Sequence, residues 1–72
     1  MSDMWYVYIV SKKTTYYTGI TTDLKNRLRQ HGNPPLLYRK SFGNKYDAAK
    51  YEKDIKKWSR VKKERLIAKF DK

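Results

Sequence analysis

The chain has 72 residues, no cysteine and a formal net charge of +11, from 18 Lys and Arg against seven Asp and Glu. This length predicts one domain, residues 1–72, with a modest core, and the lack of cysteine excludes disulfides and thiolate zinc sites. No signal peptide is recognisable, and no apolar run reaches the roughly 18 residues of a membrane span, so a soluble cytoplasmic protein is expected. The positive charge favours a polyanion as partner, most commonly nucleic acid, and not a membrane, because no segment combines that charge with a large apolar face.

The first two predicted elements are strands. Residues 5–10 and 16–20 are rich in β-branched and aromatic side chains. The polar stretch 11–14 between them is short enough for a hairpin loop. The two strands are therefore predicted to pair as a β-hairpin.

The register of this hairpin decides where two tyrosines point. If Val10 pairs with Thr15, then Tyr8 lies directly opposite Tyr17, and both hydroxyl groups emerge on one face of the sheet. A slip of one residue would place them on opposite faces.

A helix is predicted from about Thr22 to His31. Thr21 or Thr22 can cap its start, Asp23 suits its first turn, and Gly32 is a stop signal. Arg27 and His31 are four residues apart, so they share one stripe of this helix.

The second half of the chain predicts a strand and two helices. After the helix-breaking prolines 34–35, residues 36–42 have the composition of a strand, residues 47–58 have helical periodicity, and Ser59 can cap a final helix. The inward positions of these helices are predicted to be Ala48, Tyr51, Ile55 and Trp58, followed by Leu66, Ile67 and Phe70. The predicted fold is α+β: a small three-stranded sheet flanked by three helices in the order β-β-α-β-α-α.

Glu52 is the most informative polar residue. It borders an apolar stripe, where a carboxylate is costly to bury without a cation. The cation could be a metal ion, or simply Lys56 at i+4 in a surface ion pair, and spacing alone favours the ion pair.

Four further residues have both a chemical and a structural interpretation. Arg27 could clamp a phosphate or pair with Asp23, and His31 could donate to a phosphate or simply end its helix. Tyr8 and Tyr17 could orient or deprotonate a water, or form a cross-strand aromatic pair.

The order of these residues resembles a known signature. The matching segments are Tyr8-Ile9-Val10, the stretch from Tyr17-Thr18-Gly19 to Leu24, Arg27-Leu28, His31, and the helix from Lys50-Tyr51-Glu52-Lys53 to Trp58. Together they resemble the GIY-YIG nucleases, most closely the small standalone bacterial members that are similar to the nuclease domain of the bacterial repair excinuclease. The likeness covers nearly the whole chain.

The resemblance implies a metal-dependent endonuclease acting on DNA. Tyr8 or Tyr17 would act as general base or position the attacking water, Arg27 would stabilise charge on the phosphate, and His31 would assist. Glu52 would be the sole protein ligand of Mg²⁺ or Mn²⁺, which suits a cation that takes one or two carboxylates and otherwise water and phosphate oxygens. Arg27 and the metal would lower the pKa of the phenol by stabilising the phenolate.

Nucleic-acid contacts are predicted at Lys25, Arg27, Arg29, Lys56, Lys57 and Lys62. The chain departs from the family pattern at several places: Tyr6 stands where the first triplet has glycine, the second triplet is Tyr17-Thr18-Gly19, the stretch 32–35 after His31 is short, and no asparagine follows Glu52. The short stretch and the single small domain motivate one alternative, a nucleic-acid-binding module with little cleavage. Another alternative is a subunit that works only with a partner protein, and its sign would be an exposed apolar patch.

Overall fold

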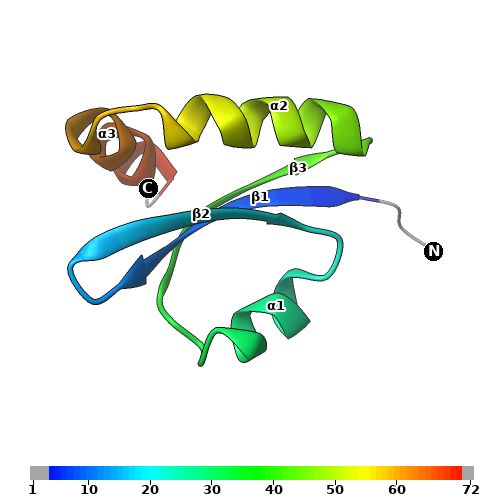
Figure 1. Ribbon diagram of the computed structural model, residues 1–72, viewed down its shortest axis with the longest axis horizontal. Coiled ribbons are helices and arrows are strands. Elements are labelled where there is room, and N and C mark those ends of the chain that lie inside the picture. The colour runs from blue at the N-terminus through cyan, green and yellow to red at the C-terminus, as the bar shows by residue number, and fades with distance from the viewer. Residues whose placement is uncertain (1–3, 71–72) are drawn as a thin grey trace.

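A computed structural model describes residues 4–70 of the chain. Its elements are β1 (Trp5–Lys12), β2 (Thr15–Thr21), α1 (Leu24–Gln30), β3 (Leu36–Phe42), α2 (Lys45–Lys56) and α3 (Arg60–Phe70). The strands form one antiparallel sheet in the order β2-β1-β3, with α1 on one face and α2 and α3 on the other (Figure 1). The predicted α+β class and the order β-β-α-β-α-α are confirmed. No helix among residues 4–70 is long and apolar enough to cross a membrane.

The central strand β1 supplies the core on both faces of the sheet. Residues 7–10 of this strand have no exposed surface. Val7 and Ile9 pack in one cluster with Ala48 and Ile55 of α2, because their side chains alternate with that of Tyr8, which faces α1. The strand that carries Tyr8 is thus fixed from both sides.

The hairpin turn is tighter than the sequence predicts. β1 continues to Lys12, which pairs with Thr15, so only Lys13 and Thr14 form the turn. Lys13 adopts a positive φ of 55°, a conformation that two-residue hairpin turns require. The polar residues 11 and 12 therefore extend the strand instead of forming a loop.

The tighter turn changes the predicted register. Val10 pairs with Tyr17 and not with Thr15, and Tyr8 lies opposite Gly19 and not opposite Tyr17. Because this is a shift of two residues, both tyrosines keep the same face of the sheet. The prediction that Tyr8 lies directly opposite Tyr17 is wrong, but the prediction that both side chains lie on one face of the sheet is confirmed.

Helix α1 starts later than predicted because Asp23 is its cap. The Asp23 carboxylate accepts a hydrogen bond from the Asn26 backbone N–H at 3.1 Å, and the Thr21 hydroxyl accepts one from the Asp23 N–H at 3.0 Å. Thr22 therefore lies outside the helix. Gly32 follows the helix with a φ of 84°, as its predicted stop role requires.

The last two helices also differ slightly from the prediction. Asn44 caps α2 by accepting the Asp47 N–H at 2.8 Å, so α2 begins before Asp47, and it ends at Lys56, two residues before Trp58. The Ser59 hydroxyl accepts the Lys62 N–H at 3.3 Å, as predicted for a cap. Leu66 and Ile67 pack on the core, but Phe70 is 43% exposed although its ring lies 5.4 Å from that of Tyr38.

Candidate active site

The site is built around Tyr8, whose ring lies over Gly19 on the neighbouring strand. Tyr8 has no exposed surface. A Cβ atom at position 19 would lie 2.6 Å from Tyr8 Cζ and closer still to the hydroxyl oxygen. Gly19 has no left-handed backbone conformation, so the reason for glycine here is the space that Tyr8 needs. Sequence reasoning alone assigned Gly19 no role, because the register that brings it beneath Tyr8 was not predicted.

Tyr17 and His31 complete an aromatic cluster with Tyr8. The ring centroids of Tyr17 and His31 are 5.0 Å apart, and each lies 6.4 Å from the centroid of Tyr8. The Tyr8 hydroxyl oxygen is 3.4 Å from His31 Nε2, a long hydrogen bond. The His31 backbone N–H also bonds the Arg27 carbonyl at 3.2 Å, so His31 both ends α1 and reaches the phenol.

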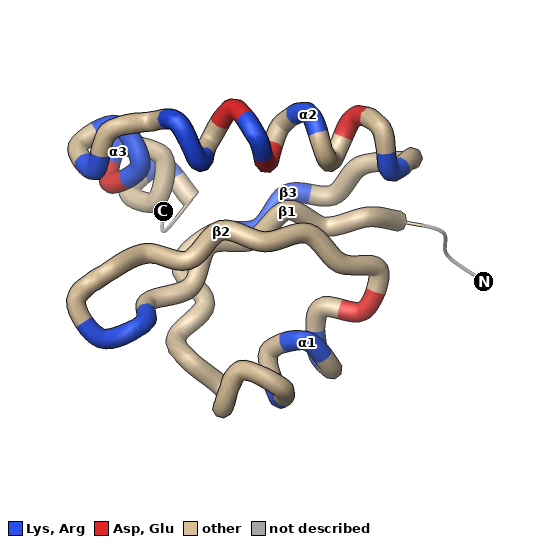
Figure 2. Tube along the Cα trace, viewed as in Figure 1, with Lys and Arg blue, Asp and Glu red and all other residues tan. Residues whose placement is uncertain are grey.

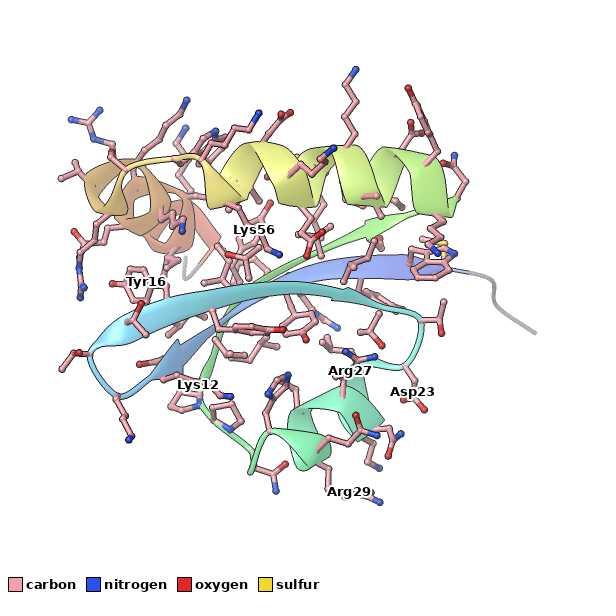
Figure 3. All side chains as sticks on the ribbon, viewed as in Figure 1. Lys12, Tyr16, Asp23, Arg27, Arg29 and Lys56 are labelled. Atoms are coloured by element: carbon pink, nitrogen blue, oxygen red, sulfur yellow. The ribbon has the colours of Figure 1, made fainter. Side chains whose placement is uncertain are left out.

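Arg27 points from α1 toward the sheet, whereas Arg29 points away from it (Figure 3). Among residues 4–70 the ion pairs are Lys56–Glu52 and Arg60–Glu64, so the alternative pairing of Arg27 with Asp23 is not formed. The Arg27 guanidinium instead lowers the pKa of the Tyr8 phenol through its charge and hydrogen bonding. This cation is directed at the aromatic cluster.

The pKa of Tyr8 is nevertheless raised above its ordinary value of 10.0. Burial is the largest cause, the neighbouring Tyr17 phenol raises the pKa further, and the opposing effect of Arg27 is smaller than these two together. The sequence predicts the direction in which Arg27 acts, but not that burial outweighs it. Tyr8 is therefore a protonated phenol at neutral pH.

Glu52 lies on α2, the helix that covers the other face of the sheet. Its side chain is 15% exposed and forms an ion pair with Lys56 at 3.2 Å, as the structural interpretation of the sequence predicts. The carboxylate still raises the pKa of Tyr8, as the weakest of the causes, so it lies within electrostatic reach of the phenol. Lys56 points from α2 toward the sheet (Figure 3). No group of three His, Cys, Asp or Glu that could hold a metal ion occurs within residues 4–70.

The predicted phosphate-binding cations fall on two sides of the molecule. Lys25, Arg27 and Arg29 belong to α1, whereas Lys56, Lys57 and Lys62 lie in the α2–α3 layer (Figure 2). Lys62 Nζ lies 4.3 Å from the centroid of the Trp58 ring. The sequence did not indicate a role for Lys12, because the strand that carries it extends further than predicted. Its Nζ lies 5.4 Å from the centroid of the Tyr17 ring.

Comparison with known proteins identifies the family of the chain. Residues 4–35 match the family model described as the GIY-YIG catalytic domain. The chain is 38% identical to the UPF0213 protein of Pectobacterium carotovorum, covering 88% of this chain and 77% of that protein, and 38% identical to that of Natronomonas pharaonis, covering 88% and 89%. The solution NMR structure of a UPF0213 protein from Bacillus halodurans superposes with a TM-score of 0.66 at 32% identity, covering 90% of this chain and 83% of that one. The chain therefore belongs to the UPF0213 proteins, a family of small standalone proteins of the GIY-YIG type.

Proposed function

We propose that this protein is a divalent-metal-dependent endonuclease that hydrolyses phosphodiester bonds in DNA. The observation that carries the proposal is the convergence of Tyr8, Tyr17 and His31, with Arg27 directed at them from α1. These groups lie on a chain with a net charge of +11, which attracts phosphate. Membership of the GIY-YIG family supports the same reaction class.

The chain's own side chains divide the work of hydrolysis. Tyr8 is protonated and has no exposed surface, so it positions His31 through their hydrogen bond and does not itself contact the attacking water. His31 Nε2, 3.4 Å from the Tyr8 hydroxyl, is placed to accept a proton when the imidazole is neutral. Tyr17 is 39% exposed and faces the incoming phosphate. The planar guanidinium of Arg27 can donate two parallel hydrogen bonds to the phosphate oxygens and so stabilise the negative charge that develops on them.

The donor set fits a hydrated Mg²⁺ or Mn²⁺ that is shared with the substrate. Glu52 offers one carboxylate with a partly exposed side chain, and Mg²⁺ commonly takes one or two carboxylates plus waters and substrate phosphate oxygens. A bound divalent ion supplies charge stabilisation at the phosphate and the leaving oxygen. Lys56 must release the Glu52 carboxylate for such an ion to bind.

A binding module with little cleavage is the second candidate function. Two observations favour it: the Glu52 carboxylate is already neutralised by Lys56, and the pKa of Tyr8 is raised, which opposes formation of a phenolate. In this case the positive surface would hold nucleic acid through phosphate contacts alone.

A cleavage assay separates the two functions. Purified protein is incubated with labelled single- and double-stranded DNA and RNA, in Mg²⁺, in Mn²⁺ and in chelator. Cutting that requires metal and is lost in Glu52→Gln and Tyr17→Phe, but kept in Tyr46→Phe, which changes an exposed tyrosine of α2, supports the nuclease. Binding without cutting in every metal supports the module. A binding affinity that does not fall as salt rises contradicts both.

A further inference from the structure

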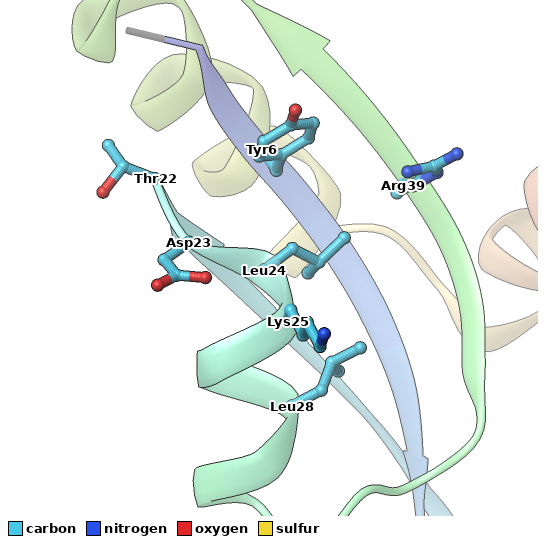
Figure 4. A pocket seen from close by; sticks show the side chains of 7 residues that line it. All are labelled: Tyr6, Thr22, Asp23, Leu24, Lys25, Leu28 and Arg39. Atoms are coloured by element: carbon cyan, nitrogen blue, oxygen red, sulfur yellow. The ribbon is translucent and has the colours of Figure 1, made fainter. Parts of the chain in front are cut away.

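A second feature of the α1 face is a groove beside the aromatic cluster. It has a volume of about 460 Å³ and lies between the start of α1 and the sheet (Figure 4). Its lining includes Tyr6, Asp23, Leu24, Lys25, Leu28 and Arg39. None of these side chains belongs to the aromatic cluster of Tyr8, Tyr17 and His31.

The groove adjoins the proposed reaction centre directly. Tyr6 precedes Tyr8 by two residues on β1, so both side chains lie on the same face, about 7 Å apart along the strand. Arg39 of β3 is the cross-strand partner of Tyr8, so it lies on this face too. A chain whose phosphate reaches Arg27 therefore has the groove beside it.

The lining combines apolar walls with two cations. Tyr6, Leu24 and Leu28 give flat and aliphatic surface, and all three are half-buried. Lys25 and Arg39 are exposed. In Figure 4, Leu24 and Leu28 extend from α1 toward the strand that carries Tyr6, and Arg39 lies on the next strand of the sheet. An aromatic face beside cations is the arrangement with which proteins hold unstacked bases and their phosphates.

Charge and shape together point to one class of occupant. A phosphate alone would leave the apolar walls exposed, and an apolar ligand would leave the two cations without a partner. Asp23 contributes one carboxylate, of which one oxygen already caps α1; its other oxygen can accept a hydrogen bond from a base amino group. A nucleotide matches the apolar walls with its base, the two cations with its phosphate, and the Asp23 carboxylate with a base amino group.

We infer that this groove binds the nucleotide next to the cleaved phosphodiester, with its base unpaired and packed against Tyr6 and its phosphate held by Arg39 and Lys25. A base inside a duplex is stacked and paired, so it must leave the helix to reach the groove. The protein thus selects strands that are unpaired beside the cleavage site. The inference rests on the proposed function for the position of the reaction centre. It also gives a role to Tyr6, the residue that replaces the glycine of the first family triplet.

Binding without metal tests the subsite independently of cleavage. The full chain is titrated in chelator into a fluorescently labelled single-stranded oligonucleotide and into the same sequence as a duplex, and the anisotropy is measured. Tyr6→Leu should weaken single-strand binding by about 5- to 150-fold, the range for losing one stacked base, and leave duplex binding unchanged. Tyr6→Phe keeps the ring and should bind like the wild type.

Two further variants guard against a folding defect at position 6. Arg39→Gln changes an exposed residue of the groove and should also weaken single-strand binding more than duplex binding, whereas Tyr46→Leu changes a tyrosine that is 75% exposed on α2 and should have no effect. Three results would overturn the inference. One is an equal loss of affinity for the single strand and for the duplex, and another is no loss in either groove variant. The third is a loss in Tyr46→Leu equal to that in Tyr6→Leu. Failure to cleave in any metal would refute the proposed nuclease and leave this binding result standing.

Discussion

Replacing Gly19 by alanine probes the contact on which the position of Tyr8 depends. The added Cβ would lie 2.6 Å from Tyr8 Cζ, well inside normal contact distance, and Tyr8 has no exposed surface into which its ring can move. Overpacking of this kind costs about 1–3 kcal/mol. The lower entropy of an unfolded chain with alanine offsets about 0.4–1 kcal/mol of that cost.

The expected net loss in the free energy of unfolding is about 1–2 kcal/mol. In a domain of this size such a loss lowers the melting temperature by about 4–16 °C. Thermal unfolding followed by far-ultraviolet circular dichroism measures the shift. Cleavage by Gly19→Ala should fall as well, because any movement of the ring changes the 3.4 Å approach of the Tyr8 hydroxyl to His31.

Gly43→Ala is the matched control for this substitution. A Cβ at position 43 meets no atom within 4 Å, and the backbone there is not left-handed. Its melting temperature should equal or exceed that of the wild type. A Gly19→Ala protein that melts at the same temperature as Gly43→Ala would refute the steric account of Gly19.

Three other predictions concern charge. Arg27→Gln should lower kcat by about 10²–10³-fold, the cost of losing one preorganised donor. Arg29→Gln, whose side chain points away from the sheet, removes a predicted phosphate contact and should raise KM but keep the wild-type kcat; equal losses of kcat in both would contradict a specific role for Arg27. Lys56→Met should tighten Mn²⁺ binding, measured by calorimetry without nucleic acid, because it frees the Glu52 carboxylate, and should change stability by less than about 1 kcal/mol; unchanged Mn²⁺ affinity would argue against Glu52 as the ligand. Burial raises the pKa of the Tyr38 phenol, so the folded state holds the phenol proton more tightly than the unfolded state does. The contribution of this phenol to the free energy of unfolding is therefore full below about pH 10 and is lost as the pH rises above that value. Urea unfolding should therefore show a steeper alkaline loss in the wild type than in Tyr38→Phe, and parallel slopes would contradict the prediction.

The type of each element could be predicted from the sequence because local signals and tertiary packing agree. β3 has the predicted bounds of Leu36–Phe42, and Ser59 caps α3 as expected. The starts of α1 and α2 were wrong by about two residues, because several neighbouring polar residues compete for the capping position. The choice between Thr21, Thr22 and Asp23 depends on backbone angles that composition does not determine.

The candidate site was less predictable than the fold. Which face Tyr8 and Tyr17 share follows from strand alternation, but their partners depend on the turn, where a positive φ at Lys13 replaces the expected longer loop. Local spacing also gave no way to see that burial dominates the pKa of Tyr8, or that the groove lies beside it. Arg39 was missed for the same reason, since its place opposite Tyr8 is fixed by long-range pairing.

The residues of the candidate site are anchored very differently. Tyr8 belongs to a strand whose residues 7–10 are all fully buried, whereas Arg27 and His31 ride on or just after a seven-residue helix that buries none of its own residues. Local opening takes place where few apolar groups are covered, so the short helix can lift from the sheet while the phenol stays in place. If a bound polymer requires more space at the candidate site, we expect α1 to move and β1 to stay in place.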